Sequence, residues 1–109
     1  MTEATMLLDH LNMPARDPEG LARWYADTFG LEAKAHVVRG PGVLLVFVRG
    51  EPVNRPAELH IGLHVPSLTA LQGWAKKFHA QITPGAEFTT TRTHDPEGNG
   101  IEIYCNSAS

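Results

Sequence analysis

The sequence repeats itself weakly with a spacing of 50 residues, and this repeat limits the possible folds more than any other feature. The matched residues are chemically alike: His10 with His60, Leu11 with Ile61, Met13 with Leu63, Leu21 with Leu71, and Trp24 with Trp74. A repeat of this kind predicts one structural unit that is used twice. Because two copies of a unit are usually related by a rough two-fold axis, we expect His10 and His60 to lie close together.

Each copy begins with a predicted strand and ends with a predicted hairpin. Side chains alternate along residues 7–13 and 59–65, as expected for a strand with two distinct faces. The other extended segments are 31–34, 35–39 and 43–48 in the first copy, and 87–93 and 101–105 in the second. Residues 40–42 (Gly-Pro-Gly) and 95–100 (Asp-Pro-Glu-Gly-Asn-Gly) provide the turns. The unit is therefore a strand, a helix, and two or three further strands.

The helix of each copy has recognisable ends. Residues 17–19 (Asp-Pro-Glu) provide a cap, a proline at the first helical position and an early acid, and Gly30 is a natural stop. In the second copy Ser67 can cap, and Lys76 and Lys77 suit the C-terminal end. The stripes at helical spacing are Leu21, Trp24, Tyr25 and Thr28, then Leu68, Leu71, Trp74, Ala75 and Phe78. These stripes predict that Trp24 and Trp74 are paired core residues beneath the sheet.

Size and composition exclude several classes of protein. The longest apolar run, Val43 to Val48, has the length of a strand and not of a bilayer-crossing helix. The net charge is -3 with no cluster of basic residues, which argues against nucleic acid as a partner. The first residues, MTEATMLLDH, predict no export signal, and a single cysteine, Cys105, suits a reducing cytoplasm. So small a chain buries only about two-thirds of its unfolded surface, which favours self-association.

Three segments together resemble a known family. DHLNMPARDPEGLARWYADTFGLEA, LHIGLHVPSLTALQGWAKKF and HDPEGNGIEIY are similar to segments of the vicinal oxygen chelate superfamily, which includes glyoxalases, bleomycin-resistance proteins and extradiol dioxygenases. The resemblance covers nearly the whole chain. It implies an α+β fold of two tandem βαβββ modules that form a cleft-shaped mixed sheet. We therefore expect one domain over residues 1–109, with module 1 at about 5–55 and module 2 at about 56–109.

The resemblance also implies a metal site. Carried over by position, the ligands are His10, His60 and Glu102, which would hold one divalent ion of Fe, Mn, Zn, Ni or Co. Many members of the family have a fourth ligand, and matching the Gly42 turn to the Gly100 turn places Leu44 there, or Leu45 after a slip of one residue. Neither leucine can bind metal, so the chain resembles the three-ligand members, including fosfomycin-resistance thiol transferases and extradiol dioxygenases. Two imidazoles and one carboxylate also form the facial triad of non-haem iron sites and leave positions open for substrate or water.

Three further residues are candidates for contact with a substrate. His64 lies two pleats from His60 on the same strand face, about 13 Å away, which is too far to share one metal and suits a rim residue or an acid-base group. Asn12 is one pleat from His10 and can reach a bound ligand. Tyr104 shares the face of Glu102 and can donate a hydrogen bond or a proton, or form an aromatic wall. His79 and His94 are interpreted as surface residues, and His36 could face either way. Nothing in the sequence supplies the neighbouring base and pocket that Cys105 would need to act as a nucleophile.

The metal ligands favour an enzyme that acts on a small oxygenated substrate chelated by the metal, with dioxygenase, lyase or thiol-transferase chemistry. The alternative is a metal-free protein that sequesters an antibiotic or other small molecule, as bleomycin-resistance proteins do. A third hypothesis is a protein that binds metal without catalysing a reaction. A homodimer is expected, and exchange of modules between subunits would supply His10 from one chain and His60 with Glu102 from the other.

Overall fold

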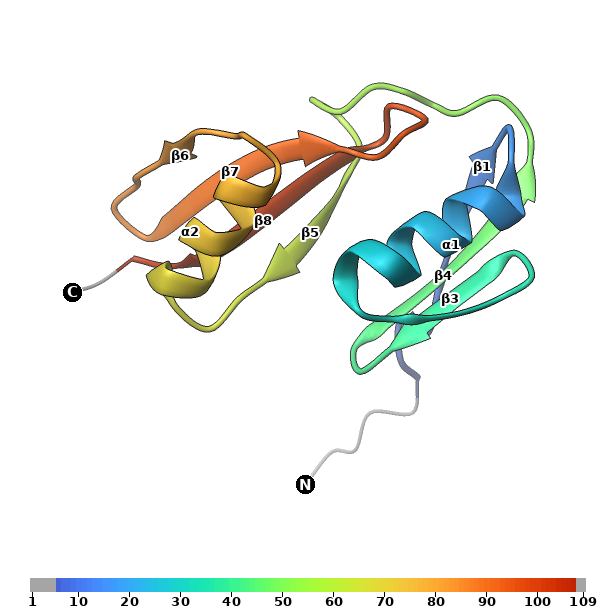
Figure 1. Cartoon of the computed structure of the whole chain (residues 1–109), viewed down its shortest axis with the longest axis horizontal. Coiled ribbons are helices and arrows are strands. Elements are labelled where there is room, and N and C mark those ends of the chain that lie inside the picture. The colour runs from blue at the N-terminus through green and yellow to red at the C-terminus, as the bar shows by residue number, and fades with distance from the viewer. Residues whose placement is uncertain (1–5, 108–109) are drawn as a thin grey trace. The chain divides into compact units, whose positions relative to one another are not determined.

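The structural repeat predicted from the sequence is present in the fold. The structure, a computed structural model, describes residues 6–107, so the ends of the predicted domain at 1–5 and 108–109 lie outside the described residues. The chain divides between Pro52 and Val53 into two compact units, and each has the element order strand, helix, strand, strand, strand (Figure 1). The prediction of two tandem βαβββ modules is therefore confirmed. That both modules form one domain stays a prediction.

The elements follow the same order in both units. Unit 1 contains β1 (Leu11–Ala15), α1 (Pro18–Phe29), β2 (Glu32–Lys34), β3 (Val37–Gly40) and β4 (Val43–Arg49). Unit 2 contains β5 (His60–His64), α2 (Leu68–Lys77), β6 (Ile82–Thr83), β7 (Phe88–His94) and β8 (Gly100–Asn106). Within residues 6–107, no helix is long and apolar enough to span a membrane.

Both helices begin and end as their caps predict. The Asp17 side chain accepts a hydrogen bond from the backbone N–H of Gly20 at 3.1 Å, and the Ser67 hydroxyl accepts one from Ala70 at 3.1 Å. These bonds satisfy amide groups that have no partner inside the first turn of a helix. Gly30 adopts the left-handed conformation with φ of 70°, where glycine has no steric penalty, and it ends α1.

Each unit forms its own four-stranded sheet. The strand orders are β1-β4-β3-β2 and β5-β8-β7-β6. In both sheets the first strand pairs in parallel with the last, and the remaining neighbours are antiparallel. The predicted strands are confirmed except that β1 begins at Leu11, and residues 7–10 lie outside the sheet although their side chains alternate. An alternating pattern shows that a strand is feasible, but it does not show how far the partner strand extends.

The helix of each unit packs on one face of its sheet and buries an apolar core. In unit 1, Tyr25 of α1 stacks on Phe47 of β4 with ring centroids 5.5 Å apart, and both side chains are fully buried. In unit 2, Leu71 is buried with Ile101 and Ile103 of β8. Burial of several such large side chains contributes about 1.5–3 kcal/mol each, which makes these contacts the main source of stability within each unit.

The prediction that Trp24 and Trp74 are core residues is wrong. Both are half-buried, whereas Tyr25 and Leu71 on the same helices are fully buried. Trp24 contacts Tyr25 edge to face at 5.0 Å, and Trp74 stacks on Phe78 at 6.3 Å with the Lys77 ammonium over its ring. A helical stripe spans a wide arc, and its tryptophans lie at the side of that arc rather than at its centre.

The opposite face of each sheet carries the polar side chains of interest. In unit 2, Ile101, Ile103 and Cys105 are buried, and the residues between them point the other way. Strand pairing then defines what we call the helix-free face of unit 2, which contains His60, Gly62, His64, Thr90, Arg92, His94, Glu102 and Tyr104. One face of one sheet thus collects side chains from β5, β7 and β8.

Candidate functional site

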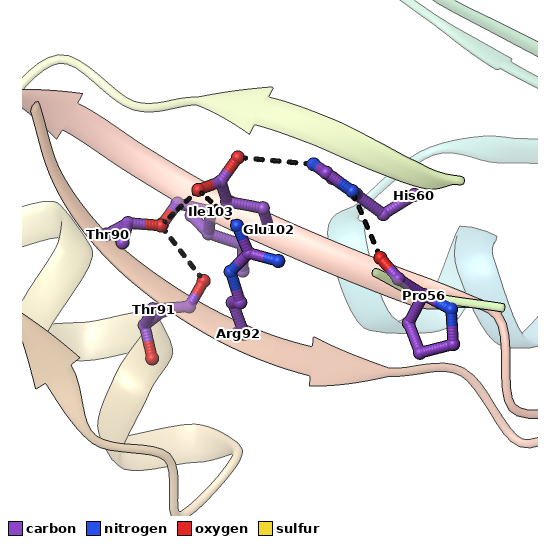
Figure 2. Close-up of polar contacts among 7 residues, drawn as sticks. All are labelled: Pro56, His60, Thr90, Thr91, Arg92, Glu102 and Ile103. Atoms are coloured by element: carbon purple, nitrogen blue, oxygen red, sulfur yellow. Dashed lines mark hydrogen bonds and ion pairs between the residues drawn. The ribbon is translucent and has the colours of Figure 1, made fainter. Parts of the chain in front are cut away.

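His60 and Glu102 form the centre of the candidate site. Glu102 lies on β8 directly opposite Gly62 of β5, so it is diagonal to His60, the first residue of β5. The His60 Nε2 atom lies 3.4 Å from Glu102 Oε1, as Figure 2 shows, and the two side chains are 29% and 22% exposed. Two of the three predicted metal ligands therefore come together within one unit, with their donor atoms directed toward each other.

The outer edge of the His60 ring is held by the backbone. His60 Nδ1 lies 3.2 Å from the carbonyl oxygen of Pro56, and because a carbonyl can only accept, Nδ1 must donate (Figure 2). Gly100 permits this close approach, since a Cβ atom there would lie 2.6 Å from Pro56 Cβ and 3.2 Å from His60 Cβ. The ring is thus fixed with Nε2 toward Glu102. The same support by a backbone carbonyl is common for histidines that bind metal.

The Glu102 carboxylate is held from the opposite side by β7. The Thr90 hydroxyl donates to Glu102 Oε2 at 2.7 Å, and its contacts with the carbonyls of Thr91 and Ile103, at 3.5 and 3.4 Å, are longer (Figure 2). Arg92 Nη2 lies 3.5 Å from the same carboxylate oxygen. With Oε2 engaged by β7, Oε1 is the oxygen that faces His60.

The turn before β8 fixes the position of Glu102. Asp95 is buried, and its carboxylate accepts from the amides of Glu97 and Asn99 at 2.9 and 3.0 Å and from the Asn99 side chain at 2.9 Å. Carboxylates of this kind commonly stabilise turns by bonding to nearby backbone groups. Because the turn is rigidly bonded and is followed at once by Gly100, the entry of β8 into the sheet is well defined.

A second group of side chains lies further along the same face. His64 Nε2 is 3.1 Å from Asn106 Oδ1, and the His64 ring is 5.0 Å from that of Tyr104. Phe88 packs edge to face on Tyr104 at 5.5 Å. The Tyr104 hydroxyl has no hydrogen-bond partner within the described part of the chain. The predicted rim position of His64 and the shared face of Tyr104 and Glu102 are consistent with this geometry, whereas their catalytic roles stay predictions.

Unit 1 holds the other two predicted site residues. His10 lies just before β1, with Nδ1 3.1 Å from Asp9 Oδ2, and its side chain is 46% exposed. Asn12 lies exposed on β1. Both residues belong to unit 1, whereas the His60–Glu102 pair belongs to unit 2.

The prediction of Leu44 or Leu45 for the fourth ligand position is wrong in register. Glu102 is opposite Gly62, whose equivalent in unit 1 is Asn12, and Asn12 is opposite Val46. The two turns differ in length: Gly40 pairs with Val43 across the first turn, whereas His94 pairs with Gly100 across the second. Aligning the turns therefore shifts the strands. Valine cannot bind metal either, so the position still carries no ligand.

The donor atoms of unit 2 fit a metal ion, although neither unit supplies three ligands by itself. Among residues 6–107, no three His, Cys, Asp or Glu side chains are grouped closely enough to hold one. His60 Nε2 and Glu102 Oε1 nevertheless provide one nitrogen and one oxygen donor with the outer atoms of both groups already bonded. This is a ligand pair that Zn, Fe, Mn, Ni and Co all accept.

Three residues that support the pair were missed from the sequence. Thr90 and Arg92 lie on β7 and Pro56 lies in the segment before β5, and none carries a recognisable motif. The signal that could have found Thr90 and Arg92 is the alternation of side chains between the two faces of a strand over residues 88–94. This alternation places both residues on one face once β7 is paired with β8. A cavity of about 550 Å³ adjoins this group and is lined by Asn54, Pro56, Ala57, Arg92, Thr93, His94 and Gly98.

Tandem βαβββ modules, with an imidazole–carboxylate pair on the helix-free face of the second, define a protein of the glyoxalase-like class. The model of the Glyoxalase/Bleomycin resistance protein/Dioxygenase superfamily matches residues 7–103, and the chain belongs to that family. No curated protein sequence matches the chain significantly.

Solved structures show the same fold at low sequence identity. A protein from Bacillus anthracis assigned to the glyoxalase family is 19% identical, with a TM-score of 0.70 and coverage of 98% of this chain and 100% of that one. An oxidase named ChaP-H1 is 21% identical, with a TM-score of 0.69 and coverage of 94% and 98%. A lactoylglutathione lyase from Agrobacterium tumefaciens is 15% identical, with a TM-score of 0.64 and coverage of 94% and 95%. Such low identities establish the fold alone, because one fold hosts many activities.

Proposed function

We propose that this protein is a metal-dependent enzyme in which His10, His60 and Glu102 hold one divalent metal ion that chelates a small oxygenated substrate. The observation that supports this proposal most directly is the arrangement of His60 and Glu102, whose donor atoms lie 3.4 Å apart. Bonds to Pro56 and Thr90 orient both groups before any ligand binds. Because the side chains are already oriented, less conformational entropy is lost when a metal ion binds.

The alternative interpretation is that His60 and Glu102 form an ordinary surface ion pair with no ligand. Exposed pairs contribute about 0–1 kcal/mol. Here the two side chains are only 29% and 22% exposed, and each has a second partner on its outer side. The family to which the chain belongs and the equivalence of His10 with His60 in the repeat add support for the ligand reading.

When bound, the metal would act as a Lewis acid toward a substrate oxygen or position dioxygen. The chain supplies the remaining functions from the helix-free face of unit 2. His64 is held by Asn106 through Nε2 and presents its other ring nitrogen as a proton acceptor. The Tyr104 hydroxyl is available to donate a hydrogen bond or a proton, and the Tyr104 and Phe88 rings provide an apolar wall for the substrate. Asn12 would contact the substrate from unit 1.

The proposal includes a homodimer, with exchange of modules between subunits as one arrangement that completes the ligand set. The small size of the chain supports self-association, since a core of this size is modest. Light scattering after size exclusion measures the mass of the particle. A particle twice the 11.9 kDa mass of the chain is expected, and a monomer that still binds metal would contradict the dimer proposal.

Elemental mass spectrometry tests the metal site. Protein purified without a chelator or affinity tag is compared with His60→Ala and with the matched control His36→Ala, in which an exposed histidine outside the site is removed. About one equivalent of Fe, Mn, Zn, Ni or Co is expected in the wild type and in the control, with most of it lost in His60→Ala. Absence of metal from the wild type after reconstitution with each ion would contradict the proposal and favour the metal-free, antibiotic-sequestering alternative.

A further inference from the structure

Arg92 is the only cation in direct contact with the His60–Glu102 pair within the described residues. One of its nitrogens, Nη2, lies 3.5 Å from Glu102 Oε2, and its side chain is 58% exposed. A guanidinium group carries five N–H donors. The ion pair with Glu102 occupies few of them, and Arg92 has no other hydrogen bond to residues 6–107. Several donors beside the proposed metal site are therefore available to a ligand.

The cavity next to Arg92 is large enough for a small anion and is lined by both polar and apolar groups. Its volume is about 550 Å³, which suits a small molecule. Arg92, His94 and Asn54 line it with hydrogen-bonding groups, and Pro56 and Ala57 add apolar surface. Among residues 6–107, no Asp or Glu lines the cavity. Its lining includes Pro56, which accepts a bond from His60, and Arg92, which contacts Glu102, so the cavity is one residue removed from each member of the pair.

The charges around the cavity then indicate which class of ligand it binds. A divalent metal, the Glu102 carboxylate and the Arg92 guanidinium have a combined charge of about +2. The Glu102 carboxylate lies between the metal position and Arg92 and offsets only part of their positive charge. A neutral substrate would leave the remaining positive charge uncompensated, whereas a carboxylate would reduce it.

We propose that Arg92 binds an anionic oxygen of the substrate, and that the substrates are small acids with a carboxylate next to a hydroxyl or carbonyl oxygen. The inference deepens the proposed function and rests on it, since the hydroxyl or carbonyl oxygen is the one held by the metal. The planar guanidinium can bind both oxygens of a carboxylate at once, which gives the site an orientation as well as a charge preference.

Isothermal titration of the zinc-loaded protein tests this inference with a pair of probes, glycolate and its neutral amide glycolamide. The wild type is expected to bind glycolate about tenfold more tightly than glycolamide, as a charge-assisted hydrogen bond to a carboxylate would give. Arg92→Gln should remove this preference, and Arg92→Lys should keep part of it. Lys76→Gln removes one positive charge from α2 in the same unit and should change nothing.

The affinity for zinc provides a second readout that moves in the opposite direction. Because Arg92 repels the cation, Arg92→Gln should bind zinc as tightly as the wild type or more tightly. Loss of zinc from this variant would overturn the inference, since Arg92 would then support the metal site instead of contacting substrate. Equal binding of glycolate by the wild type and Arg92→Gln, or equal binding of the two probes, would also overturn it.

Failure of the proposed function is distinguishable from failure of this inference. If the wild type binds none of Fe, Mn, Zn, Ni and Co, the metal proposal fails, and the anion is then tested on the metal-free protein by NMR. A shift of the Arg92 side-chain N–H resonance with glycolate but not with glycolamide would support anion binding. Identical behaviour with both probes would refute it.

Discussion

Replacement of Thr90 by valine should weaken metal binding without disturbing the fold. The substitution keeps the shape and the β-branched character of the side chain and removes the hydroxyl that donates to Glu102 Oε2 at 2.7 Å. Thr90 is half-buried on β7, so valine is well tolerated in that position. The change therefore affects the orientation of Glu102 and little else.

The expected size of the effect follows from the geometry. The Thr90–Glu102 bond is present before metal binds and remains afterwards, so most of its energy cancels in the affinity. What remains is the conformational entropy that the Glu102 side chain gains in the metal-free variant. Metal binding removes this entropy again, which costs about 0.5–1.5 kcal/mol. Arg92 still lies 3.5 Å from Oε2 and restrains the carboxylate in part, so we take about 1 kcal/mol, or a fivefold higher Kd.

Competition between the protein and a chromogenic zinc chelator measures this change directly. The matched control is Thr93→Val, a half-buried threonine of the same strand that lies on the other face of the sheet, opposite Ile101. Urea unfolding of both variants checks that the fold is retained. An unchanged zinc Kd in Thr90→Val would refute the reasoning, as would an equal loss in the control, because either result would mean that Thr90 does not orient the ligand.

Three further variants test other parts of the site. Gly100→Ala places a Cβ atom 2.6 Å from Pro56 Cβ, so it should displace the Pro56 carbonyl that supports His60 and weaken zinc binding about tenfold. An unchanged zinc Kd in the chelator competition would show that this support is not needed. Asp95→Ala leaves three hydrogen-bond donors of the turn without their acceptor, so it should lower the free energy of unfolding, measured in urea, by about 3 kcal/mol. Asp95→Asn should cause a smaller loss, and equal losses in the two variants would contradict this account. Val46→Glu should tighten zinc binding by adding a ligand at the position equivalent to Glu102, and the control Leu44→Glu should not; the reverse order would favour alignment by the turns.

The helices could be predicted closely because their ends depend on local chemistry. Asp17 and Ser67 cap the helices through bonds to amides three residues further along, and Gly30 ends α1 by its own conformation. Interactions of this range are visible in a short stretch of sequence. The spacing of the repeat likewise predicted two equivalent units, because core positions recur even where identity is low.

The register of the strands and the partners of the site could not be predicted in the same way. The position of Val46 opposite Asn12 depends on the parallel pairing of β1 with β4, which joins residues far apart in the chain. Thr90 and Arg92 reach Glu102 only because β7 pairs with β8 in one register. A threonine and an arginine in a strand have no distinctive pattern, so their role emerges only from the assembled sheet.

The parallel pairing of the first and last strands in each unit has a consequence for protein synthesis. In unit 2, β5 can complete its ladder only after β8 has been made, since Gly62 pairs with Glu102. During translation, the strand that carries His60 therefore lacks its partner until almost the entire unit has left the ribosome. Such late, nonlocal closure slows folding, and it means that a nascent chain arrested before residue 100 presents an exposed β5 edge and no candidate site at all.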